Sequence, residues 1–279
     1  MADTTAYELN DGTTLPAIGF GTYPLTGEDG IQAMVSALEA GYRLLDSAVN
    51  YGNETEVGEA VRRSGVPRDE VALTTKIPGR FHAKDLALQS LRDSAKRFGV
   101  DRLDVALIHW PNPSQDLYAQ AWQALVEAQR DGLVRTIGVS NFTGAHLRRI
   151  IDESGVTPAV NQIELHPYFP QEQMRAVHEE LGIRTQAWSP MGKREAPFDE
   201  PPVADAAAAH GVTPGQVILR WHVQLGSLPL PKSATPQRQR DNLDVFGFEL
   251  TEAEMAAITA LGRPDGRLFG GDPDTHEEM

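Results

Sequence analysis

YRLLDSAVNYGNE, residues 42–54, combines a short apolar run with an acid and a phenol. The apolar run ends at Asp46 and a helical pattern begins at Glu54, so Asp46 and Tyr51 follow a predicted strand. In a (β/α)₈ barrel, active sites lie at the carboxyl ends of the strands. An isolated acid and phenol at this spacing are more often structural, so the interpretation depends on what the other strand ends carry.

Strands and helices alternate along the chain. The predicted strands cover 17–22, 44–46, 71–76, 105–109, 134–139, 159–164, 185–187 and 228–230. The predicted helices cover 31–40, 54–63, 84–98, 119–130, 144–152, 171–181 and 214–224, with a further short helix after residue 235. This β-α order, without a linker or a break in composition, favours a single α/β domain over 1–279, a (β/α)₈ TIM barrel, rather than two doubly wound domains. The length of 279 residues suits one barrel, which needs ~250.

Three segments lie outside this alternation. Residues 1–16 predict a β-hairpin around Asp11-Gly12, which we expect to cover the N-terminal end of the barrel. Residues 191–202, after the seventh strand, and the polar tail 262–279 are expected to be loops near the C-terminal face. Both loops are candidate lids over a site at that face.

Composition excludes several classes of function. The chain has 25 lysine and arginine residues against 39 aspartate and glutamate residues, a formal net charge of −14, so we expect neither nucleic acid nor an anionic membrane as a partner. It has no cysteine, which excludes disulfides, thiolate catalysis and cysteine-ligated metals. The N-terminus lacks a signal-peptide pattern and no segment reaches the ~18 apolar residues of a membrane span, so a cytoplasmic protein is expected.

Two other predicted strand ends carry polar residues whose chemistry complements that of Asp46 and Tyr51. Lys76 and His109 each end a strand, as Asp46 does. A tyrosine has a usual pKa of ~10, an ammonium beside it lowers that pKa, and a carboxylate balances the buried ammonium. Taken singly, Lys76 as a solvated strand end and His109 as a core histidine are the simpler interpretations. Together with Tyr51 they predict a site that polarises a carbonyl and delivers a proton, with a cofactor as the reductant.

Residues 230–238, LPKSATPQR, predict where that cofactor binds. Thr235 followed by Pro236 has the form of a helix N-cap with proline at the first helical position. Lys232, Ser233 and Arg238 surround this helix start, and barrels often bind phosphate after strands seven and eight. The alternative is a solvated basic turn, although a basic cluster is unexpected in a chain of charge −14.

Six motifs extend the pattern over most of the chain. They are Asp46-Ser47-Ala48-x₂-Tyr51-Gly52-Asn53-Glu54, Thr75-Lys76, Leu107-Ile108-His109-Trp110-Pro111, Gly138-Val139-Ser140-Asn141-Phe142, Asn161-Gln162-x-Glu164-x-His166-Pro167 and Pro231-Lys232-Ser233-x-Thr235-Pro236. With these motifs the chain resembles the aldo-keto reductase superfamily and is similar to its bacterial 2,5-diketo-D-gluconic acid reductase branch. The resemblance runs from residue 15 to residue 250.

The resemblance implies an NADPH-dependent carbonyl reductase that acts on an aldehyde, ketone or dicarbonyl compound. It implies that Tyr51 is the general acid, that Lys76 and Asp46 tune its pKa, and that His109 orients the carbonyl. The implied cofactor contacts are Ser140, Asn141 and Gln162 at the carboxamide, Trp188 on the nicotinamide ring, Met191 and Gly192 along the pyrophosphate, Ser189 as a further contact, Lys232, Ser233 and Arg238 at the 2′-phosphate, and Asn242 at the adenine.

The sequence departs from the family pattern around the substrate. Ser47, Val49 and Asn50 replace residues that are commoner in the family beside Tyr51, and Tyr23 stands where many relatives carry tryptophan. The implied substrate contacts are Tyr23, Asn50 and Trp110. Two alternatives stay open: a cofactor-binding regulatory protein with little turnover, and a barrel lyase or isomerase, which the phosphate cluster disfavours. We expect a monomer, because no apolar patch argues for a dimer.

Overall fold

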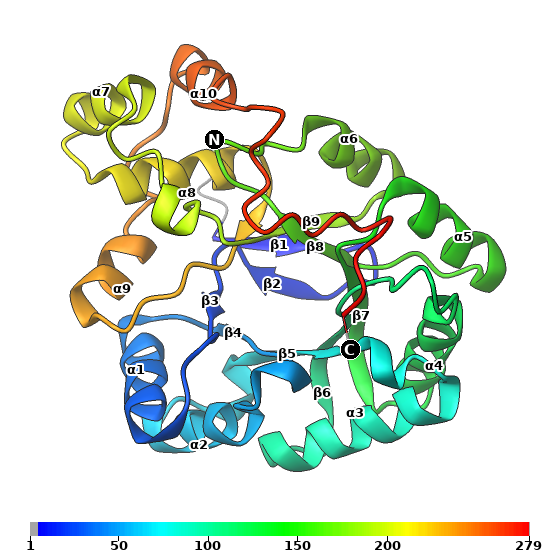
Figure 1. The fold of residues 1–279 in the computed structure, drawn as a ribbon. Coiled ribbons are helices and arrows are strands. Elements are labelled where there is room, and N and C mark those ends of the chain that lie inside the picture. Colours follow the sequence, from blue (N-terminus) through cyan, green and yellow to red (C-terminus); the bar gives the residue numbers. More distant parts are fainter. Residues whose placement is uncertain (1–4, 279) are drawn as a thin grey trace.

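The computed structural model describes residues 5–278, and its central element is a curved sheet of eight parallel strands surrounded by helices (Figure 1). The strands are β3 (Phe20–Gly21), β4 (Leu44–Asp46), β5 (Ala72–Ile77), β6 (Leu103–Ile108), β7 (Val134–Ser140), β8 (Val160–Glu164), β9 (Arg184–Trp188) and β10 (Leu228–Pro229). Each strand pairs in parallel with the next one along the chain. The first four residues of the predicted segment 1–16, and residue 279 of the predicted tail, lie outside the described residues.

Backbone hydrogen bonds join the two outermost strands of the sheet. The amide of Gly19 donates to the carbonyl of Pro229 at 3.1 Å, and the amide of Gly21 donates to Pro231 at 3.0 Å. A Cβ at Gly19 would lie 2.6 Å from the Leu230 side chain, so the glycine leaves room for that side chain where the strands approach each other. The fold is therefore an α/β TIM barrel, as the sequence predicts.

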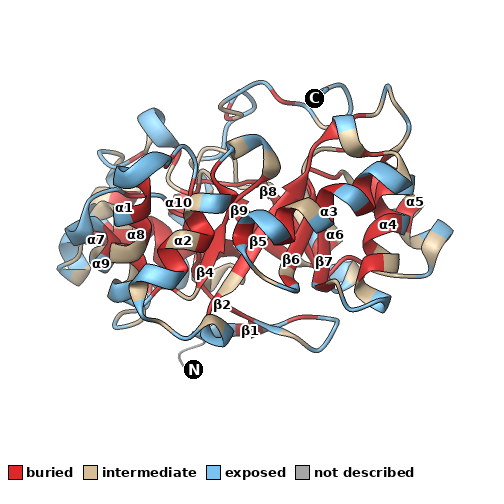
Figure 2. Ribbon diagram, turned by 90° about the horizontal axis from the view of Figure 1, so that it is seen from below, coloured by how far each residue is buried: buried red, intermediate tan, exposed pale blue. Residues whose placement is uncertain are grey.

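An antiparallel hairpin covers one end of the barrel. Strands β1 (Ala6–Glu8) and β2 (Thr14–Pro16) flank the predicted turn and place Tyr7 opposite Leu15. Both side chains are buried in one apolar cluster with barrel residues such as Leu228. Figure 2 shows the hairpin at the end of the barrel opposite the C-terminal segment, which confirms the predicted arrangement.

Helices cover the outside of the barrel, and most of them begin and end within a few residues of the prediction. They are α1 (Gly27–Ala40), α2 (Glu54–Ser64), α3 (Lys84–Phe98), α4 (Tyr118–Arg130), α5 (Gly144–Ser154), α6 (Glu172–Leu181), α8 (Pro214–Gln224) and α9 (Pro236–Leu243). Short 3₁₀ turns are η1 (Val49–Tyr51), η2 (Arg68–Glu70), η3 (Gly79–Phe81) and η4 (Lys193–Glu195). A capping box between Thr213 and Gln216 fixes the start of α8.

Two helices were not predicted, α7 (Pro201–His210) and α10 (Glu252–Thr259), and they pack against each other. The α7 sequence PPVADAAAAH is rich in alanine and lacks a clear apolar stripe, so helical periodicity does not detect it. In α10 Ile258 is the buried residue. The prediction of a loop over 191–202 was wrong at its end, because Pro201 already occupies the first turn of α7.

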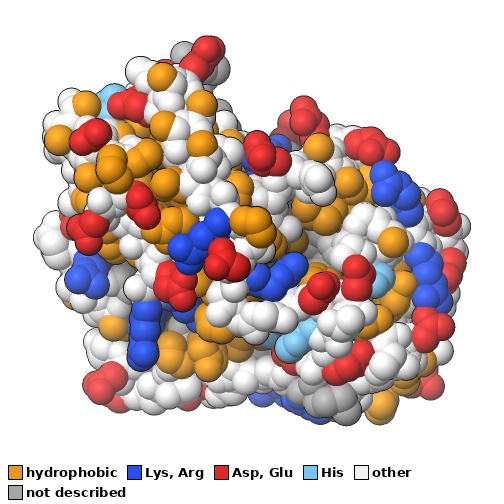
Figure 3. Space-filling view, turned by 45° about the horizontal axis from the view of Figure 1, so that its top comes forward, with side chains coloured by type: hydrophobic (Ala, Val, Ile, Leu, Met, Phe, Trp, Pro, Cys, Tyr) orange, Lys and Arg blue, Asp and Glu red, His pale blue; other side chains and the backbone are white. Residues whose placement is uncertain are grey.

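The tail crosses the C-terminal ends of the strands as an irregular segment, drawn in orange-red to red in Figure 1. Its predicted place near this face is therefore confirmed. Figure 3 shows acidic and basic side chains mixed over the visible surface. Among the described residues, no helix has the length and apolar character needed to cross a membrane.

Candidate active site

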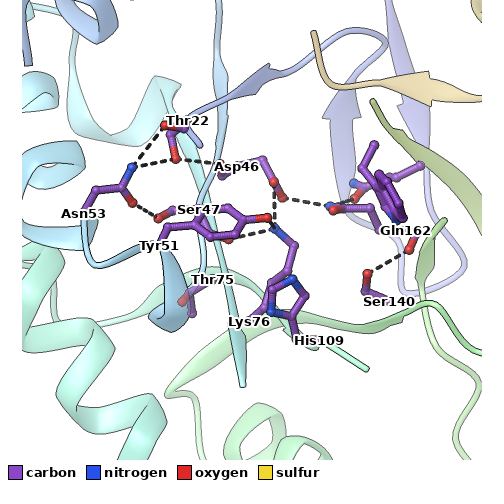
Figure 4. Close-up of polar contacts among 12 residues, drawn as sticks. Thr22, Asp46, Ser47, Tyr51, Asn53, Thr75, Lys76, His109, Ser140 and Gln162 are labelled. Atoms are coloured by element: carbon purple, nitrogen blue, oxygen red, sulfur yellow. Dashed lines mark hydrogen bonds and ion pairs between the residues drawn. The ribbon is translucent and has the colours of Figure 1, made fainter. Parts of the chain in front are cut away.

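A buried ammonium lies at the centre of the polar residues in Figure 4. Lys76, near the end of β5, has no exposed side-chain surface and its Nζ lies 2.7 Å from Oδ2 of Asp46. The same ammonium donates to the carbonyl of Ser47 at 2.9 Å and to the Tyr51 hydroxyl at 3.3 Å. Three of the predicted residues thus meet, although β4, η1 and β5 supply one each. The partners use the donors of the ammonium and compensate its buried charge.

Burial and the neighbouring groups together set the protonation of Tyr51 and Lys76. Burial raises the pKa of Tyr51, Lys76 lowers it and Asp46 raises it, and the net result is a raised pKa. The expectation of a net lowered tyrosine pKa was wrong, because the cost of placing a phenolate in this buried position exceeds the help from Lys76. Burial lowers the pKa of Lys76, but Asp46 and Tyr51 outweigh it and leave that pKa raised. At neutral pH the site therefore holds a protonated phenol beside a charged ammonium.

His109 follows β6 and faces the phenol. Its ring centroid lies 5.8 Å from that of Tyr51, in an edge-to-face arrangement. The ring of Tyr23, a predicted substrate contact, lies 5.1 Å from Tyr51 on an exposed loop. Trp110 and Asn50 contact the tail instead: the Trp110 ring lies 4.2 Å from that of His276, and Asn50 donates to Glu278. Aromatic and polar side chains therefore border the same end of the barrel.

The residues predicted to bind a carboxamide are hydrogen-bonded to one another, to Asp46 and to the backbone of His109. Gln162, on β8, donates to Oδ1 of Asp46 at 2.8 Å, so both carboxylate oxygens have a donor. Ser140 donates to the carbonyl of Gln162, and Asn141 donates to Ser140 and to the carbonyl of His109. Because these donors already have partners, a bound carboxamide would have to replace one of them or use a remaining acceptor lone pair.

Trp188 ends β9, and its indole donates to Oδ1 of Asn141 at 2.8 Å. Its ring centroid lies 5.9 Å from that of Phe269 in the tail. Beyond it Ser189 has a positive φ of 49°, and the amide of Gly192 donates to the Ser189 carbonyl at 2.9 Å. This turn directs Met191 onto the apolar core, where its side chain is partly buried.

The predicted phosphate cluster lies at the start of α9. The backbone of Thr235 is extended at the N-cap position and Pro236 follows, but the Thr235 side chain makes no capping bond. Instead the Ser233 hydroxyl accepts from the Thr235 amide at 3.1 Å. Lys232 and Arg238 are exposed on either side, and Asn242 is buried further along the helix. Two exposed cations beside a helix N-terminus fit a phosphate-bearing ligand.

Two residues near the site were missed. Asn53 is fully buried, accepts from Ser47 at 2.6 Å, and donates to the carbonyls of Thr22 and Leu25. It ties the loop that carries Tyr23 to the Asp46 segment. The second is Glu278, whose carboxylate lies beside His109. Nothing in the sequence of the tail indicates that contact.

Within residues 5–278 there is no group of three or more histidine, aspartate or glutamate side chains placed to hold a metal ion.

The structure is a TIM barrel that gathers a phenol, an ammonium, a carboxylate and an imidazole at the C-terminal ends of its strands. The profile of the aldo/keto reductase family matches residues 17–196 and 200–263. The chain belongs to this family.

Relatives agree with this assignment. The chain is 56% identical to 2,5-diketo-D-gluconic acid reductase B of Corynebacterium sp. (strain SHS752001) over 100% of both chains. It is 41% identical to methylglyoxal reductase DkgA of Escherichia coli (strain K12) over 98% of both chains. The chain also matches the crystal structure of a Gox0644 mutant in complex with NADPH. The two are 41% identical, 98% of each chain is covered, and the TM-score is 0.93.

Proposed function

We propose that the protein is an NADPH-dependent carbonyl reductase that acts on a small aldehyde, ketone or dicarbonyl compound. The observation that carries the proposal is the buried Lys76 ammonium, which contacts both Asp46 and the Tyr51 hydroxyl next to the His109 ring. Membership of the aldo/keto reductase family supports it. The two reductases named above and the NADPH complex of Gox0644 support the reaction and the cofactor.

Tyr51 is the proposed general acid. Its raised pKa keeps the phenol protonated at neutral pH, so a proton is available when negative charge develops on the carbonyl oxygen. The adjacent Lys76 ammonium then stabilises the phenolate that remains, and Asp46 holds the ammonium in place. When bound, NADPH supplies the hydride that reduces the carbonyl carbon.

His109 is proposed to orient the carbonyl oxygen toward the Tyr51 hydroxyl. The neighbouring rings of Tyr23 and Trp110, together with the amide of Asn50, would contact the rest of the substrate. The names of the relatives point to dicarbonyl compounds as the substrate class, since 2,5-diketogluconate and methylglyoxal each carry two aldehyde or ketone groups.

The cofactor is proposed to extend from the strand ends to α9. Lys232, Ser233 and Arg238 would bind the 2′-phosphate, with Asn242 near the adenine. The remaining proposed contacts are Ser140, Asn141, Gln162, Trp188, Ser189, Met191 and Gly192. We further propose that the chain is one domain, because the hairpin packs in the barrel core and the tail contacts the strand ends.

Replacement of Tyr51 by phenylalanine tests the proposal. The ring volume is kept and only the proton donor is lost, so NADPH-dependent reduction of butane-2,3-dione should fall by about 10²–10⁴-fold. The NADPH Kd should stay within about threefold. Tyr118→Phe is the matched control, because the Tyr118 hydroxyl contacts Arg149 outside the site.

Full activity in Tyr51→Phe would show that another group donates the proton. If the parent protein binds NADPH but turns over none of a panel of aldehydes, ketones and dicarbonyls, the regulatory alternative replaces the reductase.

A further inference from the structure

Residues 262–278, here called the strap, are attached at several points across the face that carries the site. The amide of Arg263 donates to the Tyr168 carbonyl at 3.1 Å. The amide of Leu268 donates to the buried carboxylate of Glu164, at the end of β8, at 2.6 Å. These contacts fix the first part of the strap on one side of the barrel.

Ring contacts hold the middle of the strap. Phe269 lies on Trp188, and the Lys193 ammonium lies 4.4 Å from the Phe269 ring centroid. At Gly271 the backbone passes over Trp110 so closely that a Cβ would lie 2.8 Å from the indole. The His276 ring then lies against the same indole, with the two ring planes tilted by 49°. Glycine at 271 is therefore what allows the strap to run directly over Trp110.

The strap ends with a carboxylate inside the site. Oε1 of Glu278 lies 2.8 Å from Nδ1 of His109 and accepts from Nδ2 of Asn50 at 2.7 Å. The backbone carbonyl of Glu278 accepts from Asn112, and the neighbouring Glu277 accepts from the amide of Ser114. The Glu278 side chain is only 16% exposed, so this carboxylate is inserted rather than lying on the surface.

Hydrogen bonds and nearby charges keep Glu278 ionised. Burial would raise the pKa of Glu278, but His109, Asn50 and Lys76 outweigh burial and hold that pKa below its usual range. In turn, the charge of Glu278 adds to the effects that raise the pKa of Tyr51. An oxyanion therefore lies against the imidazole that, in the proposed reaction, receives the carbonyl oxygen.

We propose that Glu278 is an internal inhibitor: its carboxylate occupies the position of the substrate carbonyl oxygen beside His109, and substrate must displace it to react. The proposal rests on the carbonyl reductase function proposed above. The second oxygen, Oε2, is buried and has no hydrogen-bond partner among the described residues, so one half of the carboxylate is poorly satisfied. The occupied arrangement is thus open to competition from a better ligand.

The consequence is a lower apparent affinity for every ligand of this position. Apparent Kd rises as the fraction of molecules with a vacant site falls, while the rate of the reacting complex is unchanged. Glu278→Gln keeps the shape of the side chain and removes its charge. It should lower the KM for butane-2,3-dione, a neutral dicarbonyl, by at least about threefold and leave kcat within about twofold.

Asp274→Asn is the matched control. Asp274 lies on the same strap, is 66% exposed and is 3.8 Å from His146 rather than His109. The same change of charge at this position should alter neither KM nor kcat. A chain that ends at His276 is the second variant, because it removes the inserted carboxylate without placing an amide in the site, and it should lower KM at least as much as Glu278→Gln.

A binding measurement separates the internal inhibitor from the reductase function. Benzoate, a carboxylate that cannot be reduced by this reaction, is titrated calorimetrically into each variant with NADP⁺ present. Glu278→Gln should bind benzoate at least about threefold more tightly than the parent protein. Tighter benzoate binding without turnover of any carbonyl would sink the reductase function and leave the contact in place. The proposed role of Glu278 would be overturned if benzoate affinity were unchanged in both Glu278→Gln and the chain that ends at His276. A KM for butane-2,3-dione that rises in these variants would overturn it as well.

Discussion

Lys76→Met should be strongly destabilising, because it leaves the Asp46 carboxylate buried without its ion-pair partner. Side-chain exposure is 0% for Lys76 and 6% for Asp46, so water does little to compensate the remaining charge. Removing one partner from a buried pair typically costs ~3–5 kcal/mol. Asp46 keeps the hydrogen bond from Gln162, which compensates part of the cost, so we expect the lower half of this range.

The assay is urea denaturation followed by circular dichroism, with the free energy of unfolding extrapolated to water. Lys96→Met is the matched control, since Lys96 is 75% exposed and its pair with Asp93 lies on the surface. That variant should change stability by less than about 1 kcal/mol. The double variant Asp46→Asn with Lys76→Met removes both charges and should be more stable than Lys76→Met alone.

Two results would refute this reasoning. A loss below about 1 kcal/mol in Lys76→Met would mean that Asp46 carries no uncompensated charge in the variant. A double variant that loses the sum of the two single effects would mean that the residues are energetically independent despite their 2.7 Å contact.

Two further predictions concern the cofactor and acid stability. Neutralising Lys232 and Arg238 together should weaken NADPH binding by about 10²-fold or more, since each of the two lost charge-assisted bonds contributes ~1.5–3 kcal/mol, while NADH affinity measured by fluorescence titration stays the same; equal losses would assign the cluster a structural role. Burial lowers the pKa of His178 to about 4 and that of His222 to about 3. The folded chain keeps these rings neutral whereas the unfolded chain binds protons below ~6.5, so the stability they contribute is present above that pH and is lost as pH falls toward 4 and 3. Urea midpoints should fall between pH 6.5 and 4, and His178→Gln should flatten that decline; an unchanged slope would show that other groups cause it.

The sequence predicted the barrel because its signals are local and repeated. Each strand is a short apolar run that a helical pattern follows, and α3 and α8 have the predicted bounds. The helix α7 was not predicted because its alanines give no periodic contrast, although alanine favours the helix and the segment packs against α8 and α10. A helix was thus predictable from the sequence where an apolar stripe faces the barrel. It was not predictable where small residues pack on a neighbouring helix.

The site was predictable to the extent that topology determines it. Parallel strands place their C-terminal ends together, so Asp46, Tyr51, Lys76 and His109 had to lie near one another. The net pKa of Tyr51 did not follow from this proximity, because it depends on the balance between burial and two opposite neighbouring charges. The insertion of Glu278 could not be foreseen either, since the strap has no periodic pattern and its course depends on contacts with side chains such as Trp110.

The hydrogen bonds around Asp46 connect the two halves of the proposed site. Gln186 accepts from Gln162, Gln162 donates to Asp46, and Asp46 pairs with the ammonium that reaches Tyr51. This series of hydrogen bonds crosses the barrel interior. A change in the Gln162 amide therefore alters the partners of Asp46 and, through Lys76, the environment of the Tyr51 phenol. In a buried network the members polarise one another, and the effect of one substitution is not confined to its own contact. If Gln162 binds the carboxamide as proposed, cofactor binding and the acidity of Tyr51 share a single set of hydrogen bonds, and neither can be tuned without changing the other.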